Sequence, residues 1–403
     1  MKNVTCVEDL HQIAKRKVPQ AFFEYAEAGS YTESTLRANL ADMEAVKLRQ
    51  RVLVNVDARE TSTTICGEKF SVPVVLSPIG MLGMQHGDGE ILACRAAHEA
   101  GIQFTLSTMS ICSIEDVAAA VHKPFWFQLY VIRDREFMRD LIARALAADC
   151  SALVLTVDLQ VLGQRHRDIK NGLTVPPQIR LKSLFDIASK PAWAWSVLKG
   201  KRKTFGNLAG HVKGMDDVTS LSTWTAQQFD PTLNWSDIEF IRKLWPRTLI
   251  LKGIMDVEDA RIAAKCGAHA IVCSNHGGRQ LDGASSSIAM LPRIADAVGD
   301  DIEVLFDGGV RTGMDIERAI ALGARGCFVG RSYVWGLGAH GQAGVAKTID
   351  IFKKELDISM ALTGVSSIAE IGPNVLLDPP FQQVSTVKKK AAAKATAKPR
   401  KRK

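Results

Sequence analysis

The sequence lacks any uninterrupted apolar stretch of about 18 residues, so it predicts no membrane-spanning helix. Its first residues, MKNVTCVEDLHQIAKRK, contain acids and no apolar centre, which argues against a secretory signal. No CxxC pair occurs, which favours buried reduced thiols over disulfides or a zinc site. The eight scattered cysteines are Cys6, Cys66, Cys94, Cys112, Cys150, Cys266, Cys273 and Cys327. We therefore expect a cytoplasmic protein with no metal site.

Acidic residues are absent from the C-terminal segment 388–403, KKKAAAKATAKPRKRK, which carries nine Lys or Arg. Because the whole chain has a net charge of +8, the remaining residues sum to −1 and are close to neutral. Low-complexity Lys/Ala sequence cannot bury enough apolar surface to fold. We expect one domain over 1–387 and a disordered basic tail over 388–403. A solvated tail is the first interpretation; weak contact with an anionic membrane surface or nucleic acid is the second, and no specific nucleic-acid partner is expected.

Eight short apolar runs recur along the chain, and continuous runs of this kind are typical of parallel strands covered on both faces. They lie at 72–80, 103–107, 125–131, 152–158, 248–253, 270–275, 304–309 and 326–330. Segments with helical spacing lie between most of them, and 113–116, 256–259 and 312–315 are typical helix starts. Eight strand–helix units predict an α/β fold, a (β/α)8 TIM barrel, with a doubly wound sheet as the second choice.

Two segments fall outside this alternation. Residues 1–71 are expected to form an N-terminal helical cap, with strands that could close the bottom of the barrel. Residues 159–247 form a long insertion after the fourth strand, in which 191–214 holds two tryptophans beside a basic run. That composition suits a membrane interface, and packing on the barrel top is an equal alternative. The GxGxxG match at 336–341 follows no strand directly, so we interpret it as helix packing.

Polar residues gather where the predicted strands end, which is where barrel enzymes carry their chemistry. At the last two ends, glycines would let backbone N–H groups approach a phosphate, although they could also only make tight turns. At the sixth, His276 could act as a base and Arg279 could hold a carboxylate. Asp158 could pair with the protonated imidazole, and Lys252 would place a positive charge deep in the site.

The residues at these ends, in this order, resemble the FMN-dependent 2-hydroxy-acid oxidase and dehydrogenase family. SNHGGRQLDG at 274–283 is similar to the family signature, and the resemblance runs from about residue 5 to 380. Other matching segments are FFEYAEAGSYTESTLRAN (22–39), LSPIGMLGM (76–84), FTLSTMS (104–110), FWFQLYV (125–131), LTVD (155–158), LKGI (251–254), DGGVR (307–311) and GR (330–331). Within the family, TLRAN, WFQLYVIRDREFMRD and FDPTLNW are most similar to bacterial respiratory L-lactate dehydrogenases.

The resemblance implies roles for individual residues. Catalysis would use His276 with Asp158, and Tyr25 and Tyr130 would hydrogen-bond the substrate, whose carboxylate Arg165 and Arg279 would grip. Tyr25 and Arg165 rest on the resemblance alone. The residues implied in binding FMN are Pro78, Ile79, Gly80, Ser107, Gln128, Thr156, Lys252, Ser274, Asp307, Gly308, Gly309, Arg311, Gly330 and Arg331.

The implied reaction is FMN-dependent oxidation of an L-2-hydroxy acid, with L-lactate to pyruvate as first choice. The base removes a proton while two electrons pass to FMN, as a hydride or by way of a carbanion. Gly80 favours a quinone or other carrier over oxygen, and Met109 is expected to tune the substrate side chain. Alternatives are an oxygen-using oxidase, a mandelate-type dehydrogenase and, outside enzymes, a phosphate-ligand binding barrel. The resemblance also suggests a homo-oligomer, as a tetramer, with peripheral contact at the inner face of the cell membrane.

Overall fold

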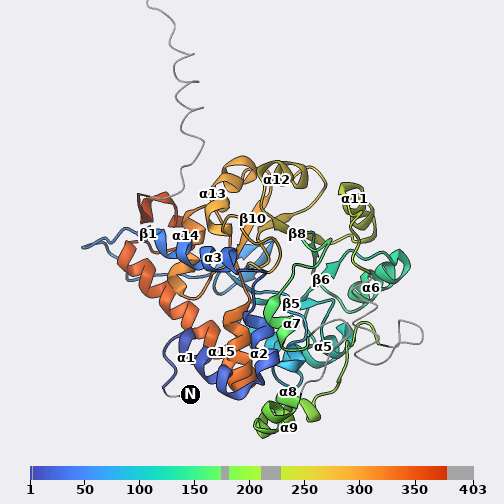
Figure 1. Cartoon of the computed structure of the whole chain (residues 1–403). Helices are drawn as coiled ribbons and strands as arrows, with labels where there is room; N and C mark the ends of the chain where they lie inside the picture. The colour runs from blue at the N-terminus through green and yellow to red at the C-terminus, as the bar shows by residue number, and fades with distance from the viewer. Residues whose placement is uncertain (2, 174–180, 210–227, 379–403) are drawn as a thin grey trace, which may run out of the picture.

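Eight parallel strands close into a barrel (Figure 1), which confirms the predicted TIM barrel and excludes the doubly wound sheet. The computed structural model describes residues 1, 3–173, 181–209 and 228–378, so the predicted tail at 388–403 lies outside the described residues. Strands adjacent in sequence are neighbours throughout, and the last one pairs with the first. The barrel strands are β4 (Val74–Leu76), β5 (Gln103–Ser107), β6 (Trp126–Tyr130), β7 (Ala152–Thr156), β8 (Thr248–Ile254), β9 (Ala270–Cys273), β10 (Glu303–Asp307) and β11 (Cys327–Val329).

A helix follows each barrel strand and covers its outer face. These helices are α4 (Gly89–Ala100), α5 (Ile114–Val121), α6 (Arg135–Ala147), α11 (Trp235–Leu244), α12 (Val257–Ala263), α13 (Ser287–Val298), α14 (Gly313–Ala321) and α15 (Arg331–Thr363). The three predicted helix starts are confirmed, because the side chains of Ser113, Asp256 and Thr312 accept hydrogen bonds from backbone N–H groups of the first turns. The glycine motif at 336–341 lies inside α15, as predicted, where the backbone kinks at His340 and Gly341.

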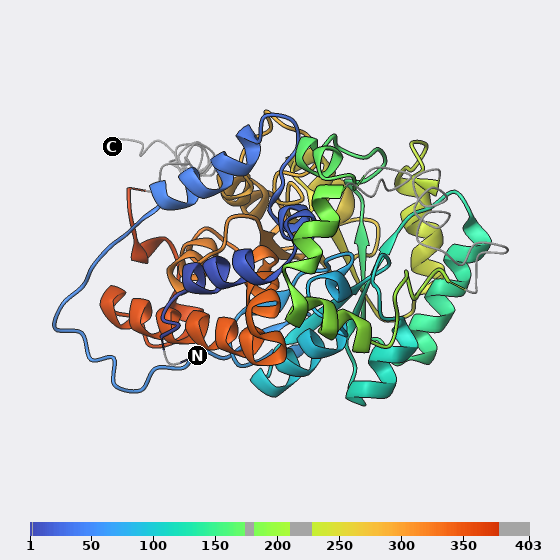
Figure 2. The same ribbon diagram turned by 60° about the horizontal axis from the view of Figure 1, so that its bottom comes forward.

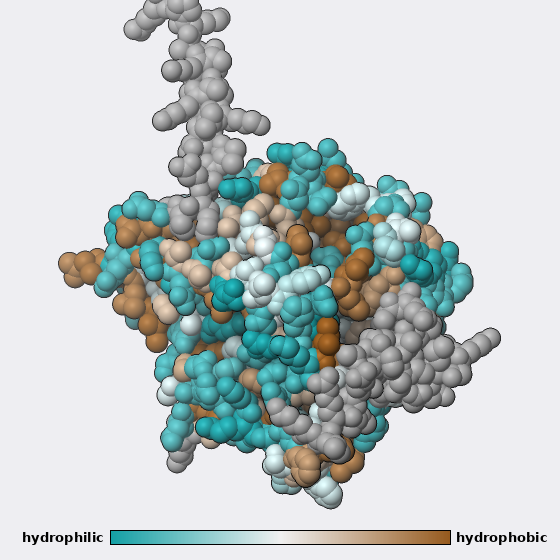
Figure 3. All heavy atoms as spheres, in the orientation of Figure 1, coloured by the Kyte–Doolittle hydropathy of each residue, from teal (hydrophilic) through white to brown (hydrophobic). Residues whose placement is uncertain are grey.

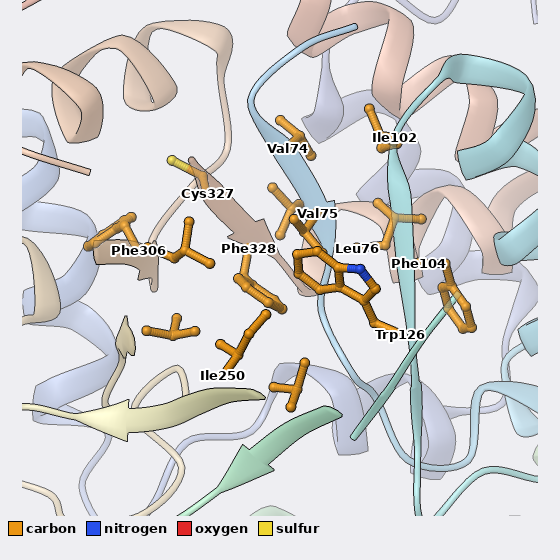
Figure 4. Packing of buried hydrophobic residues seen from close by; sticks show 14 of the residues in the cluster. Val74, Val75, Leu76, Ile102, Phe104, Trp126, Ile250, Phe306, Cys327 and Phe328 are labelled. Carbon is orange, nitrogen blue, oxygen red and sulfur yellow. The ribbon is translucent and has the colours of Figure 1, made fainter. Parts of the chain in front are cut away.

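The bottom of the barrel is closed by a hairpin of β2 (Thr63–Ile65) and β3 (Glu68–Phe70). Glu68 accepts hydrogen bonds from Gln103 Nε2 (2.6 Å) and Trp126 Nε1 (3.0 Å), the first residues of β5 and β6. Inside the barrel, the Trp126 ring lies 6.0 Å from that of Phe328 between centroids (Figure 4). A buried indole needs a partner for its N–H, and the hairpin supplies one, so this end is filled and sealed.

The other N-terminal elements flank the barrel and reach its mouth. Helices α1 (Val7–Lys17) and α2 (Gln20–Glu27) lie beside α15 (Figures 1 and 2), and α3 (Ser34–Ala45) contacts α13. A short antiparallel pair joins β1 (Lys47–Leu48) to β12 (Leu376–Leu377). The remaining elements are the 3-10 helices η1 (Leu82–Met84), η2 (Ile368–Glu370) and η3 (Pro373–Val375).

The predicted insertion after the fourth barrel strand carries α7 (His166–Lys170), α8 (Leu181–Ala188) and α9 (Pro191–Lys199) before α11. Its two tryptophans differ. Trp193 packs on the body, stacked against Phe22 with 5.4 Å between ring centroids, whereas Trp195 is largely exposed. Trp193 therefore packs on the protein, and the membrane-interface interpretation stays a prediction for Trp195. All eight cysteines are free; five are buried and three are half-buried. Among the described residues, no helix is both long and apolar enough to cross a bilayer.

Candidate active site

A cavity of about 810 Å³ opens at the carboxyl ends of the barrel strands. Most of the predicted site residues line it, namely Tyr25, Pro78, Ile79, Gly80, Tyr130, Thr156, Arg165, Lys252, His276, Arg279, Asp307, Gly308, Gly309, Arg311, Gly330 and Arg331. Ser107, Gln128 and Ser274 are buried against side chains of this set or against one another, and Asp158 contacts His276. The structure thus brings the predicted residues together around one space.

His276 and Asp158 form the central pair of this cavity. Nδ1 of His276 lies 2.9 Å from Oδ1 of Asp158, so the other ring nitrogen is left for a ligand. His276 has φ +58, a left-handed conformation that is unusual outside glycine, and Gly277 and Gly278 follow it with positive φ. An imidazole oriented by a carboxylate is suited to take up a proton, because the anion stabilises the imidazolium.

The backbone of β8 makes room for that pair. The pairing register between β8 and β9 shifts between Lys252 and Ile254, and Gly253 there has φ +109. A Cβ at Gly253 would lie 2.6 Å from Cγ of Asp158. Gln280 fixes the backbone at Asp158, since its Nε2 donates to the carbonyl oxygens of Asp158 (2.7 Å) and Val161 (2.8 Å). The position of Asp158 is therefore set from two strands and one loop.

Two arginines and two tyrosines surround the space beside His276. Arg279 Nη1 donates to the carbonyl oxygens of Tyr25 (2.7 Å) and Ala28 (2.8 Å), and its guanidinium lies 5.1 Å from the Tyr25 ring centroid. Burial, and then the nearby charge of Arg165, lowers the pKa of Arg279 to about 10, so it stays cationic near neutral pH. Burial, together with Tyr25 and Asp158, raises the pKa of Tyr130, which therefore stays an O–H donor.

Sequence reasoning missed Asp168, which lies in α7 and lines the cavity. Its Oδ2 lies 3.1 Å from Nε of Arg165, while its Oδ1 is buried without a hydrogen-bond partner among the described residues. Burial raises the pKa of Asp168 although Arg165 acts to lower it. The signal available in the sequence was the i, i+3 spacing of a base at the N-cap and an acid in the first turn of one short helix.

A second missed pair stabilises the loop before His276. Asn39 Nδ2 donates to Asn275 Oδ1 (2.8 Å), and Asn275 Nδ2 donates back to Asn39 Oδ1 (2.7 Å). This pair ties α3 to the loop after β9. Asn39 is the last residue of the matching segment TLRAN, so that motif contained it without indicating its role.

Lys252 does not present an unpaired charge to the cavity. Its Nζ lies 2.8 Å from Oδ2 of Asp307 and donates to Oγ of Ser274 (2.9 Å), and the Ser274 hydroxyl donates to Asp307 (2.8 Å). Burial acts to raise the pKa of Asp307, but Lys252 outweighs it and the pKa is lowered. The expected positive charge is present, as one half of a buried ion pair.

The ends of β10 and β11 form a site suited to an anion. Arg331 and Arg311 are half-buried and close enough for their charges to interact, and burial followed by the charge of Arg311 lowers the pKa of Arg331 to about 10. Neither arginine makes an ion pair within 4.0 Å with a carboxylate of the described residues. The charge of Glu27, which lies farther away, acts to raise the pKa of both. Gly308 and Gly309 have φ +120 and +89, so their backbone is open to an approaching group. Two like charges that are close together and partly removed from water are stabilised by an anion such as phosphate.

Buried polar atoms test whether FMN fits these residues. Gln128 Oε1 accepts from Ser107 Oγ (3.1 Å), but its Nε2 is buried without a partner among the described residues, and so is Nε of Arg331. A buried donor without a hydrogen-bond partner lowers the stability of the folded protein unless a ligand accepts from it. A flavin has carbonyl oxygens for an amide and a phosphate for an arginine, so the donor set fits FMN.

A barrel that holds an imidazole–carboxylate pair, two arginines and an anion site around one cavity defines an enzyme that works with a phosphate-bearing cofactor. The chain belongs to the FMN-dependent dehydrogenase family, whose profile matches residues 14–378.

Known proteins similar to this chain share nearly its whole length. The L-lactate dehydrogenase of Caulobacter vibrioides (strain NA1000 / CB15N) is 47% identical over 379 residues, covering 93% of this chain and 98% of that protein. The L-lactate dehydrogenase of Haemophilus influenzae (strain Rd) is 46% identical with the same coverage. Among solved structures, the monotopic membrane protein (S)-mandelate dehydrogenase has a TM-score of 0.88 and 33% identity, covering 93% of this chain and all of that one. Mandelate oxidase with (S)-4-hydroxymandelic acid has a TM-score of 0.80 and 36% identity, covering 93% and 98%.

Proposed function

We propose that this protein oxidises L-lactate to pyruvate and passes the electrons to a quinone or another carrier. The observation that carries the proposal is the placement of His276, held by Asp158, and Arg279 on one cavity. The identity of 46–47% to L-lactate dehydrogenases over nearly the whole chain supports lactate as the substrate.

In this mechanism, Arg165 and Arg279 bind the substrate carboxylate, for which a guanidinium is suited by its two parallel N–H groups. Tyr25 and Tyr130 hydrogen-bond the substrate and orient its hydroxyl group. His276 takes up the substrate proton, and Asp158 stabilises the imidazolium that forms. Bound FMN would supply the acceptor for the two electrons that the substrate α-carbon loses. Gln128, Lys252 and Ser107 would hold its ring system, and Arg311, Arg331 and the glycines at 308–309 its phosphate.

The test is anaerobic mixing of the purified yellow protein with L-lactate. The flavin absorbance should bleach with L-lactate and stay unchanged with D-lactate. A flavin that L-lactate does not bleach would contradict the proposal.

A larger 2-hydroxy acid is the second candidate substrate, favoured by the mandelate enzymes among the similar structures. Met109 lines the cavity near Gly80 and is flexible enough to make room for a bulkier side chain. Oxygen is the alternative acceptor. Comparing turnover of L-lactate with that of (S)-mandelate, and the yield of peroxide, separates these alternatives from the first.

We propose peripheral contact with the inner face of the cell membrane through α8 and α9. Apolar side chains there are exposed, from 50% for Leu184 to 76% for Phe185, with Trp195 and Leu198 between them. Figure 3 shows brown surface at the lower end, where α9 lies in Figure 1. Lysines at 199, 201 and 203 follow, and Lys199 lies 4.7 Å from the Trp195 ring centroid. Aromatic and basic side chains together suit an anionic lipid surface. Co-sedimentation with anionic and neutral vesicles tests this.

Self-association, as a tetramer, is the last part of the proposal. The segment 49–62 extends from the body on the left of Figure 2, and its Leu53 is fully exposed with φ +58. The segment is fixed at its base, because Arg51 N donates to the carbonyl oxygen of Leu362 (2.9 Å), and Leu362 is itself exposed. Exposed apolar groups that are held in place favour a protein partner. Light scattering of the native protein and of Leu53→Asp tests it, since the variant should shift towards smaller species.

A further inference from the structure

The cavity continues beyond the residues that the proposed reaction uses. Its lining includes a set of apolar side chains that we name the apolar arm: Phe22, Met81, Met84, Leu184 and Ile187. These come from α2, the segment 81–84 and α8, not from the barrel strands. All five are half-buried or more exposed, as expected for side chains that border an open space.

The arm lies one helical turn away from the substrate region. Phe22 and Tyr25 are three residues apart on α2, and both line the cavity. On the facing loop, a Cβ at Gly80 would lie 3.1 Å from the Tyr25 hydroxyl oxygen, and the loop then continues to Met84. The arm is therefore an extension of the active site itself, in reach of the ring system that Ile79 and Gly80 are predicted to contact.

Contacts between α2, α8 and α9 hold the arm in shape. Gln20 N donates to Asp186 Oδ2 (2.5 Å), which joins the start of α2 to α8. Trp193 Nε1 donates to the carbonyl oxygen of Met84 (2.9 Å), and its ring stacks on Phe22. These contacts fix the positions of the helices and of the segment 81–84 whose aromatic and sulfur-containing side chains line the arm.

Charge does not suit the arm to a second anionic substrate. Asp186 is engaged by the start of α2, and Lys203 Nζ donates to the carbonyl oxygen of Gly200. The hydroxy acid is a small anion, and the two arginines proposed to bind it, Arg165 and Arg279, lie 5.8 and 5.1 Å from the ring centroid of Tyr25. An uncharged ligand with apolar surface is therefore the class that this lining favours.

The outer end of the arm meets the exposed apolar surface of α8 and α9. Leu184 belongs to both, since it lines the cavity and is also 50% exposed. Phe185 and Leu198 continue the apolar surface outward. A ligand dissolved in lipid could enter here without crossing water.

We infer that the apolar arm binds a membrane quinone, with the quinone ring towards Gly80 and the hydrocarbon tail leaving past Leu184. The inference rests on the proposed function, in which a carrier must remove the substrate's electrons. The overall reaction balances: the 2-hydroxy acid loses two electrons and two protons to become the 2-oxo acid, and the quinone gains both pairs to become the quinol.

The test uses the flavin-loaded full chain with two acceptors, decylubiquinone and ferricyanide, and L-lactate as donor. Met84→Gln and Ile187→Asn each place an amide in the arm, and should raise the KM for decylubiquinone about tenfold, because an amide is poorly accommodated beside a hydrocarbon tail. The rate with ferricyanide and the rate of anaerobic bleaching by L-lactate should stay unchanged. Phe185→Gln is the matched control, since Phe185 lies on α8 but does not line the cavity, and its KM for decylubiquinone in detergent should equal that of the native protein.

The other possible results distinguish failure of the proposed function from failure of the quinone site. If native protein is not bleached by L-lactate, the proposed function fails. If bleaching is normal but both variants keep the native KM for decylubiquinone, the quinone site fails. If the variants instead raise the KM for (S)-mandelate alone, the arm holds a bulky substrate side chain and the inference is wrong. Native protein offers a check without variants: a ubiquinone without a tail should have a KM at least tenfold above that of decylubiquinone, and equal values would contradict the inference.

Discussion

His276 and Asp158 are 118 residues apart in the chain, yet Nδ1 of one lies 2.9 Å from Oδ1 of the other. The contact joins the loop after β9 to the end of β7, across β8. It fixes which ring nitrogen faces the cavity, because the hydrogen bond to the carboxylate occupies the other one.

Replacing His276 by alanine should lower kcat by about 10²–10⁴-fold, the range expected when a general base is lost. FMN should stay bound, since the anion site at β10 and β11 is untouched. Steady-state turnover and the visible spectrum of the purified variant measure the two effects. Turnover at the native rate would remove His276 from the mechanism.

Arg279→Lys should lower kcat/KM roughly 10- to 150-fold, because the lost charge-assisted hydrogen bonds are worth about 1.5–3 kcal/mol. The charge is kept, so the effect measures the geometry of the guanidinium. Arg167→Lys is the control, since Arg167 is exposed and pairs with Glu33 at the surface. Equal kinetics in the two variants would mean that Arg279 does not hold the substrate.

Gly253→Ala should reduce activity strongly by displacing Asp158, whose Cγ would lie 2.6 Å from the new Cβ. The matched control is Gly67→Ala. Gly67 has φ +81, against +109 for Gly253, but a Cβ there meets nothing within 4 Å. Both variants carry backbone strain, so both should lose stability, and only the first should lose turnover. Thermal unfolding and steady-state rates separate the two. A Gly253→Ala enzyme as active as Gly67→Ala would show that Asp158 tolerates displacement.

Glu115 gives a pH-dependent contribution to stability. Burial acts to raise its pKa, but the hydrogen bonds and charge of Arg144 outweigh it and lower the pKa to about 2, from the ordinary 4.5. The stabilisation is therefore fully present above pH 4.5 and is lost as the pH falls towards 2. Because Glu115 is half-exposed, we expect less than about 1 kcal/mol.

Urea unfolding of native protein and Glu115→Gln at several pH values tests this. The difference between the two should shrink as the pH falls below 4.5. Glu136→Gln is the control, because Glu136 is almost fully exposed and its pairing distance to Arg139 is 3.6 Å. A difference that is constant with pH would assign the effect of Glu115→Gln to something other than the ion pair.

The barrel could be predicted because its signal is local. Each strand is a short continuous apolar run, and each confirmed helix start carries its own capping side chain within four residues. His276 and Arg279 could be predicted for the same reason, since they follow a predicted strand and lie next to glycines. The positions of catalytic side chains at strand ends then follow from the fold.

The rest depends on contacts that sequence spacing does not encode. Tyr25 comes from α2, outside the barrel strands, and only the resemblance pointed to it. The pairing of Lys252 with Asp307 joins β8 to β10 across β9, and no spacing within either strand indicates it. Trp193 and Trp195 lie two residues apart on one helix, and only the orientation of α9 decides that one packs inward and the other faces out.

The pairing of β1 with β12 has a consequence for biosynthesis. Leu48 meets Leu376, and β4 cannot close the barrel until β11 has been made. Most of the polypeptide must leave the ribosome before the ring of strands can shut, and contacts this distant in sequence slow folding. Apolar strand edges of the nascent chain therefore stay uncovered for most of translation, which makes this protein a candidate for help from chaperones.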